Sequence, residues 1–343
     1  MHRSTKRGIH QLIIWKFLIS FIAVWLFQGC AVTGPKISST EEAEARREIR
    51  VRVLQNWIRD VQRSSAVIYR VRKTLPSKDC CGFPAITVIS LNKMKAEDHE
   101  LWEIVTDRSL PKTGYLLLPV PGGLAEQAGI KLYDVALELP CGKLQPHEKV
   151  TIKLEDRVVE FPAEKVGVKL NDWAVVPSGQ ANAFVDLSRN LYIFSGLLRY
   201  VNDDNQLAVI VGHELAHLER GHIGKKAAVG LCVSLLTLAA EIVITQGQSN
   251  GELSKLVTDL VIGKFSRDQE READYFGLKY CQLAGYDIEK GANVWLDIGS
   301  NAPASLTKSL LSTHPNSAER LARLRKIISL LKEGKTWDEF EKN

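Results

Sequence analysis

Two histidines and a glutamate stand close together in an apolar part of the second half of this 343-residue chain. After Asp203, which with Gln206 resembles the start of a capped helix, the apolar residues keep helical spacing. His213 and His217 are four residues apart and therefore share one face of that helix. Two imidazoles at this spacing can bind one Zn²⁺, and Glu214 can act as a general base toward an attacking water. The segment predicts a zinc site on a helix.

The spacing alone leaves an alternative open. Because the chain has eight histidines, such a pattern arises by chance in roughly 1% of comparable sequences, as two surface histidines on an amphipathic helix. A third ligand would decide between the two. His222 is not expected to supply it, because a rotation of ~100° per residue places it about 140° around the helix from His217.

A later helix offers a better candidate for the third ligand. Ser266 and Gln269 have the spacing of a capping box at its start. Glu270 and Asp274 are four residues apart on one face, so one carboxylate can complete a zinc site while the other hydrogen-bonds a ligand histidine. Glu272 is two residues from each and is expected to be a solvent-exposed helical charge.

Two more short motifs complete the pattern: Asn182, Ala183 and Phe184, then Thr313, His314 and Pro315. Taken in their order along the chain, the four motifs resemble those of the zinc endopeptidases of metallopeptidase family forty-eight. This family includes heat-shock proteases, CAAX prenyl endopeptidases and periplasmic proteases. The resemblance extends from Asn171 to about Leu331. It implies a gluzincin fold that cleaves peptide bonds within polypeptide substrates.

The resemblance also implies a role for each residue of the motifs. His213, His217 and Glu270 would bind one Zn²⁺ per chain. Glu214 would be the catalytic base. Asp274 would support the site from behind by hydrogen bonding to a ligand histidine.

Three further roles follow from the same resemblance. Asn182, Ala183 and Phe184 would form the edge strand that pairs with an extended substrate. His314 would occupy a fourth zinc position and shield the resting site, as in periplasmic relatives, although a histidine before proline is also typical of the start of a helix. Arg320 would stabilise the oxyanion.

The N-terminus has the features of an export signal. Residues 1–29 begin with basic residues and continue as an apolar stretch. Gly29 and Cys30 at its end resemble a bacterial lipobox, so we expect lipid modification of Cys30, with residues 30–40 as a flexible tether. Ala31 after the cysteine resembles the outer-membrane sorting pattern. The alternative is an uncleaved signal anchor with an ordinary cysteine.

The net charge depends on this segment. The whole chain carries a formal charge of +5, and residues 1–29 contain four basic residues and no acidic one, so a chain that begins at Cys30 would carry +1. A mature protein that is almost neutral gives no electrostatic reason to expect a nucleic-acid partner. We expect membrane attachment through the lipid.

The rest of the chain divides by its pattern into an α+β arrangement. Residues 41–75 have the spacing of one long amphipathic helix, which we expect to pack on the peptidase domain. Residues 83–170 form a β-rich module. Residues 171–335 form the peptidase domain, which is expected to be mainly helical with a small β-sheet. Strands in the β-rich module are expected at Ala85–Leu91, Tyr115–Val120, Val135–Leu139, Val150–Leu154 and Val158–Phe161.

The β-rich module resembles a bacterial PDZ domain over about 50 residues. The stretches Gly114–Val120 and Gly123–Ile130 carry this resemblance. Only Leu144–Lys149 separate one turn from the next strand, which leaves no room for the helix that walls a peptide groove. The alternative is a structural β-rich insert that binds no peptide.

A nearly apolar stretch, Ala227–Thr245, lies between the two motif helices and approaches the length of a membrane span. We expect a buried or membrane-facing helix there, and insertion across the membrane is the alternative. Cys232 and Cys281 lie in apolar helical patterns and are expected to be buried thiols.

These patterns together predict a zinc endopeptidase, lipid-anchored in the bacterial cell envelope and facing the periplasm from the outer membrane. Its substrates would be unfolded or misassembled envelope proteins. The alternative is a binding or chaperone-like protein whose zinc site is gated shut by His314.

Overall fold

The computed structural model describes most of the chain in two units, Met1–Ile49 and Arg50–Asn343. The described residues are 34–76, 81–140, 144–168, 170–201, 203–225, 265–301 and 317–341. The predicted signal, Cys30, the apolar stretch 227–245 and His314 lie outside these ranges. No helix within the described ranges is both long enough and apolar enough to cross a bilayer.

The predicted long helix is confirmed as α2 (Ser39–Arg72). Its start lies in the first unit, where Ser38 and Glu41 form reciprocal caps. The backbone N–H of Glu41 donates to Oγ of Ser38 at 3.1 Å, and the backbone N–H of Ser38 donates to Oε2 of Glu41 at 2.6 Å. These bonds satisfy donors that a helix start leaves open.

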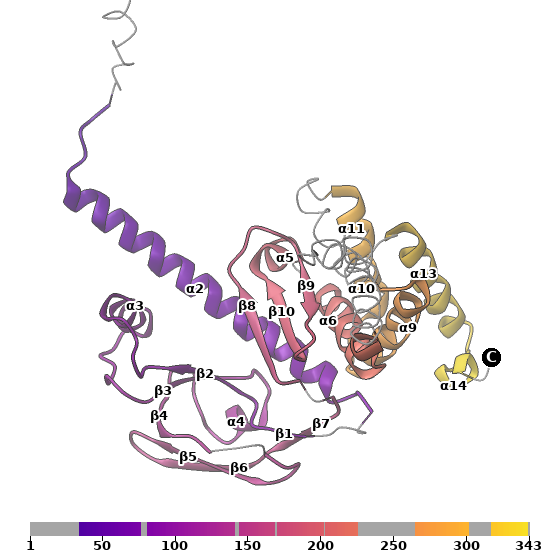
Figure 1. The fold of residues 1–343 in the computed structure, drawn as a ribbon, viewed down its shortest axis with the longest axis horizontal. Coiled ribbons are helices and arrows are strands. Elements are labelled where there is room, and N and C mark those ends of the chain that lie inside the picture. The colour runs from indigo at the N-terminus through magenta and orange to yellow at the C-terminus, as the bar shows by residue number, and fades with distance from the viewer. Residues whose placement is uncertain are drawn as a thin grey trace, which may run out of the picture. The chain divides into compact units, whose positions relative to one another are not determined.

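The β-rich module contains a five-stranded antiparallel sheet in the order β2-β3-β4-β5-β6 (Figure 1). Alternate side chains of β5 are buried, as expected for a sheet with one face on a core. The strands are β2 (Ile86–Ser90), β3 (Tyr115–Pro119), β4 (Val135–Glu138), β5 (Lys149–Leu154) and β6 (Val158–Pro162), which confirms the predicted strands.

The module also contains elements that the pattern did not predict. Helix α3 (Ala96–Thr106) buries only Leu101 and Trp102, which explains why its apolar spacing is weak. The short helix α4 (Leu124–Gln127) follows β3. Strand β1 (Cys81–Phe83) pairs with β7 (Glu164–Val166), joining the two ends of the module.

The free edge of β2 has no PDZ-type helix beside it within the described residues. Residues 144–148 form a turn, as the short connection predicted. A cavity of about 780 Å³ lies at this edge, and its lining residues include Val88 of β2 and Trp173 of the peptidase sheet. The wall opposite β2 is therefore supplied in part by another sheet.

Helix α2 contributes to the cores of both the module and the peptidase domain. Val61, Ile68 and Val71 pack in the large peptidase core, while Ile58 packs with Trp102 in the module. The indole N–H of Trp57 donates to the carbonyl of Val175 at 3.0 Å. The expectation that this helix packs on the peptidase domain is confirmed.

The peptidase domain contains a three-stranded sheet in the order β8-β10-β9. Strand β10 (Asn190–Phe194) pairs in parallel with β8 (Asp172–Val176) and antiparallel with β9 (Ala183–Val185). Ala183 and Ile193 are fully buried in the large core, so one face of the sheet packs against it. Among the described residues, no further strand pairs with β9, so it is an edge strand of this sheet.

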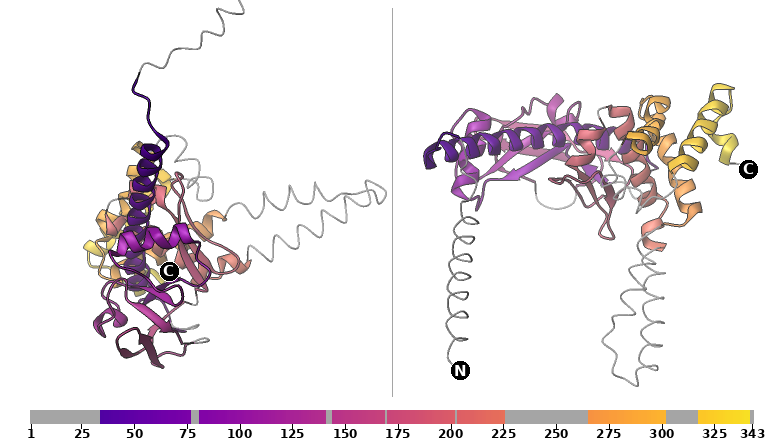
Figure 2. Two further views of the ribbon diagram at one scale, coloured as in Figure 1. Left: turned by 90° about the vertical axis from the view of Figure 1, so that its left-hand side faces the viewer. Right: turned by 90° about the horizontal axis from the view of Figure 1, so that it is seen from above.

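The remaining described elements of the domain are helices, and α9 lies against α6 (Figures 1 and 2). Helix α13 packs against α9, α10 and α11. The thiol of Cys281 on α9 is buried and free, as predicted. The helices are α5 (Ser195–Tyr200), α6 (Asp204–Glu219), α9 (Arg267–Leu283), α10 (Ile288–Ala292), α11 (Val294–Asn301), α13 (Ser317–Lys332) and α14 (Trp337–Glu341).

Candidate active site

The starts of the two motif helices are fixed by side-chain caps. Oδ1 of Asp203 accepts a hydrogen bond from the backbone N–H of Asn205 at 2.7 Å at the start of α6. Gln206 does not complete a capping box there, because its amide donates to Asp297 on α11 at 2.6 Å. At the start of α9, Ser266 and Gln269 form the predicted capping box.

Two glycines allow α6 and α9 to cross closely beside the motif. A Cβ atom built on Gly277 would lie 2.7 Å from the backbone nitrogen of His213 and 2.9 Å from the carbonyl carbon of Gly212. A Cβ atom on Gly212 would lie 2.8 Å from the carbonyl oxygen of Gly277. Only glycine fits at this contact without displacing a helix, and the contact brings the face of α9 that carries Glu270 onto the histidines.

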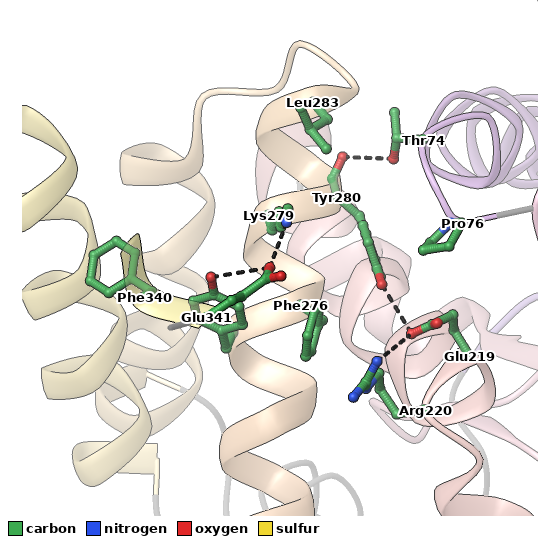
Figure 3. Close-up of a pocket in the computed structure, with 11 residues that line it drawn as sticks. Thr74, Pro76, Glu219, Arg220, Phe276, Lys279, Tyr280, Leu283, Phe340 and Glu341 are labelled. Carbon is green, nitrogen blue, oxygen red and sulfur yellow. Dashed lines mark hydrogen bonds and ion pairs between the residues drawn. The ribbon is translucent and has the colours of Figure 1, made fainter. Parts of the chain in front are cut away.

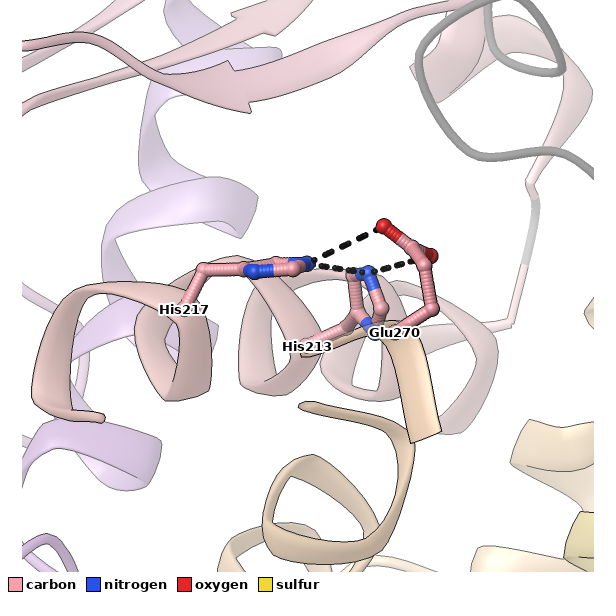
Figure 4. A group of neighbouring side chains, drawn as sticks. All are labelled: His213, His217 and Glu270. Atoms are coloured by element: carbon pink, nitrogen blue, oxygen red, sulfur yellow. Dashed lines mark hydrogen bonds and ion pairs between the residues drawn. The ribbon is translucent and has the colours of Figure 1, made fainter. Parts of the chain in front are cut away.

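The crossing gathers three predicted ligands into one buried group, His213, His217 and Glu270, whose candidate ligand atoms lie within 4.8 Å of one another. Figure 4 shows the three side chains pointing toward one another, the histidines from α6 and Glu270 from α9. The two Nε2 atoms are 3.0 Å apart, and the Glu270 oxygens lie 3.4 Å from Nε2 of His217 and 3.5 Å from Nε2 of His213.

The spacing of these atoms fits a tetrahedral zinc ion. Zn–N and Zn–O bonds of about 2.1 Å place neighbouring ligand atoms roughly 3.4 Å apart. The observed separations of 3.0, 3.4 and 3.5 Å lie close to that value. Two imidazoles and one carboxylate are also a donor set typical of catalytic zinc sites, which keep one position open.

Glu214 follows the ligand His213 in the sequence, and its side chain contacts the edge strand β9. Its Oε2 accepts a hydrogen bond from the backbone N–H of Val185 at 3.3 Å, and the side chain is buried. The register pairs Phe184 with Tyr192 on β10, so the backbone groups of Ala183 and Val185 face the free edge. The predicted base and the predicted substrate strand are therefore in contact.

Asp274 supports His213 from the side away from Glu270. Its Oδ1 lies 3.1 Å from Nδ1 of His213, as the spacing predicted. Burial raises the pKa of the Asp274 carboxyl above its ordinary value, while the guanidinium of Arg320, at 2.6 Å, and that of Arg323, at 3.0 Å, oppose this shift.

Arg320 is almost fully buried beside the ligand group. Its guanidinium lies 3.6 Å over the ring of Trp295, and Nη2 lies 2.8 Å from Nδ1 of His213. Its observed partners include Asp274, His213 and Glu270, whose Oε2 lies 3.5 Å from Nη1 of Arg320, so Arg320 contacts two members of the ligand group. The oxyanion role predicted for it stays a prediction.

Comparison with known proteins gives the family. The sequence profile of Peptidase family M48 matches residues 151–328, more than half of the chain. The chain belongs to peptidase family M48. The matched range includes both motif helices and the β8-β10-β9 sheet.

Several curated M48-like metalloproteases are similar to this chain. The mitochondrial metalloendopeptidase OMA1 of Danio rerio is 32% identical over 193 residues, which cover 51% of this chain and 40% of that protein. Metalloprotease YcaL of Escherichia coli is 25% identical over 49% of this chain and 67% of its own length. Metalloprotease LoiP of the same organism is 28% identical over 46% and 63%. The chain thus spans less than half of its mitochondrial OMA1 relative.

The structure corrects two expectations within this M48 site. Glu272 is not a solvent-exposed charge, because its side chain is 33% exposed and its carboxylate bonds both Arg220 and His222. His222 is not in the ligand group, as expected, but the reason differs. Helix α6 ends at Glu219, and Gly221, with φ of +70°, turns the chain so that His222 returns to contact His217. Burial lowers the pKa of the His222 imidazole.

Proposed function

We propose that this M48 chain is a zinc-dependent endopeptidase. The single observation that carries the proposal is the buried His213, His217 and Glu270 group, with the neighbouring Glu214 in contact with the edge strand β9. A carboxylate base next in sequence to a ligand histidine and in contact with an edge strand is suited to hydrolysis of an extended polypeptide.

Each residue of the site would have its own role in the reaction. Nε2 of His213, Nε2 of His217 and the carboxylate of Glu270 would hold the metal. When bound, zinc supplies Lewis acidity, which lowers the pKa of an attacking water and polarises the substrate carbonyl. Glu214 would take the proton of that water and deliver it to the leaving amine as the C–N bond breaks. The outward-facing backbone groups of Ala183 would bind the substrate backbone.

The cellular role follows from the N-terminal sequence. The lipobox-like Cys30 supports a lipid-anchored protein in the bacterial envelope, facing the periplasm from the outer membrane. An edge strand binds a substrate through hydrogen bonds to the substrate backbone rather than through its side chains. This mode of binding suits substrates that expose extended segments. We propose unfolded or misassembled envelope proteins as this substrate class.

Cleavage of unfolded casein tests the activity. The purified wild type should degrade casein, and Glu214→Gln, which cannot accept the proton, should lose at least about 100-fold of the rate. Both proteins should bind zinc equally, because Glu214 is not in the ligand group. Glu289→Gln, which changes an exposed carboxylate paired with Lys332, serves as the matched control and should keep wild-type activity. Equal rates for wild type and Glu214→Gln would refute the proposal.

A further inference from the structure

The second predicted metal ligand, His217, is connected on its Nδ1 side to the buried ring of His222 and, through it, to the partly exposed carboxylate of Glu272. Its Nδ1 atom lies 3.0 Å from Nδ1 of His222, and Nε2 of His222 lies 2.9 Å from Oε2 of Glu272. Both imidazoles are 0% exposed, so water does not compete for the hydrogen bond between them. The zinc-ligand pattern of the sequence does not include His222 or Glu272.

The chemistry of the donors fixes where the protons lie. An ionised carboxylate only accepts hydrogen bonds, so Nε2 of His222 must carry the hydrogen that faces Glu272. In a neutral imidazole the other nitrogen then has a lone pair, and Nδ1 of His222 accepts. It can accept only if Nδ1 of His217 carries a hydrogen. This arrangement leaves the lone pair of His217 on Nε2, the atom that faces His213 and Glu270.

The carboxylate of Glu272, at the end of this series of hydrogen bonds, is itself held in place. The second oxygen of Glu272, Oε1, accepts a hydrogen bond from Nε of Arg220 at 2.7 Å. The Arg220 guanidinium lies 4.3 Å over the ring of Phe276 and 3.8 Å from Glu219, which also accepts from the hydroxyl of Tyr280 (Figure 3). Each carboxylate oxygen of Glu272 therefore has its own partner, which restricts rotation of the group.

The two ligand histidines differ in how they are supported. Nδ1 of His213 faces the carboxylate of Asp274 directly, at 3.1 Å. On the side of its Nδ1 atom, His217 is connected to the carboxylate of Glu272 through the intervening ring of His222. The ring of Phe265 stacks on His217 with centroids 3.8 Å apart, which restricts its tilt but not the choice of protonated nitrogen.

We infer that His222 and Glu272 are positioning residues that set the tautomer and orientation of His217, so that Nε2 is presented to the metal. Neither residue touches the metal or substrate. The inference rests on the proposed function in that it requires a metal at this site. Partners of ligand histidines of this kind affect metal affinity by about 10–100-fold.

Zinc affinity of the full chain tests the inference without any peptidase assay. Competition with a chelator should show a zinc Kd about 10–100-fold higher for His222→Leu, which removes the acceptor. His222→Asn places an amide oxygen near the position of Nδ1 and should recover most of the affinity. His99→Leu removes an imidazole of the β-rich module that hydrogen-bonds Pro111 and should leave the Kd unchanged.

The visible spectrum of the cobalt-substituted protein gives a second measurement, because its band positions and intensities report the coordination geometry. His222→Leu should change the spectrum and His222→Asn should restore it. If His222→Leu does not fold, Glu272→Leu tests the same series of hydrogen bonds with His222 in place. This variant should also raise the zinc Kd.

The outcomes separate this inference from the proposed function. If the wild type binds neither zinc nor cobalt, the metal site itself is wrong. If the wild type binds and His222→Leu or Glu272→Leu binds equally well with an unchanged spectrum, only the positioning role is overturned. The same holds if His222→Asn is as weak as His222→Leu, because the acceptor atom then plays no part.

Discussion

Replacing Gly277 with alanine tests whether the close crossing of α6 and α9 builds the metal site. The added Cβ atom would lie 2.7 Å from the backbone nitrogen of His213 and 2.9 Å from its Cα atom. Ordinary contacts begin at 3.4 Å. Because the atoms opposite are backbone, no side chain can rotate away, and the helices must separate by roughly 0.7 Å to reach an ordinary contact.

Two terms oppose each other in the stability of Gly277→Ala. Alanine in a helix interior is favoured over glycine by about 1 kcal/mol. Overpacking of a tight contact costs roughly 1–3 kcal/mol. We therefore expect a net destabilisation of up to about 2 kcal/mol, measured by urea unfolding with and without zinc.

The metal site should be affected more than the fold. Glu270 lies on α9 and the histidines lie on α6, so a separation of about 0.7 Å far exceeds the ±0.2 Å tolerance of zinc bond lengths. We expect the zinc Kd to rise at least tenfold, which corresponds to about 1.4 kcal/mol. Gly224→Ala is the control, since a Cβ there meets no described atom within 4 Å. A Gly277→Ala protein with wild-type zinc Kd and equal or higher stability would refute the reasoning.

Three further predictions concern the ligand set, the packing of α2 and the anchor. Glu270→Gln should lower the zinc content of the purified chain well below one per chain, as measured by atomic absorption, and unchanged content would contradict the ligand assignment. Trp57→Phe removes the hydrogen bond to the carbonyl of Val175 and should lower the free energy of unfolding by about 1 kcal/mol; an unchanged urea midpoint would show that this bond adds no stability. Cys30→Ala should abolish labelling of the protein with radioactive palmitate in bacteria, and persistent labelling would exclude the lipobox.

The core of the site was predictable because it depends on spacing within single helices. His213 with His217, and Glu270 with Asp274, share a helical face whenever the segment is helical, and the structure places all four together. The capping box at Ser266 marked the start of the second helix correctly. Local geometry of this kind is fixed by the chain itself.

The position of His222 was beyond this reasoning because it depends on where a helix ends. The angle of about 140° from His217 assumes that α6 continues. In the structure α6 stops at Glu219, and Gly221 adopts a left-handed conformation. A glycine after the last helical turn is a common stop signal, so Gly221 was the available clue. Once the chain turns there, His222 meets both His217 and Glu272.

Contacts between distant segments were also not visible in the pattern. Helix α3 buries too few residues to show a clear period, and β1 pairs with β7 across most of the module. Arg320 also contacts Asp274, a partner that the sequence pattern did not indicate. Such partners are set by the tertiary packing, which no single-segment pattern contains.

One face of α9 nevertheless carries both the carboxylates of the metal site and the residues that pack against α6. Glu270, Asp274, Gly277 and Cys281 follow one another at intervals of four, three and four residues, so they share a helical face. The two carboxylates reach the ligand group, Gly277 permits the close backbone contact, and the thiol of Cys281 donates to the carbonyl of Ala208 at 2.9 Å. Since the face that packs is the face that carries the third ligand, a change in the packing distance must move Glu270 relative to the histidines. Zinc affinity should therefore be a more sensitive measure of this helix contact than stability.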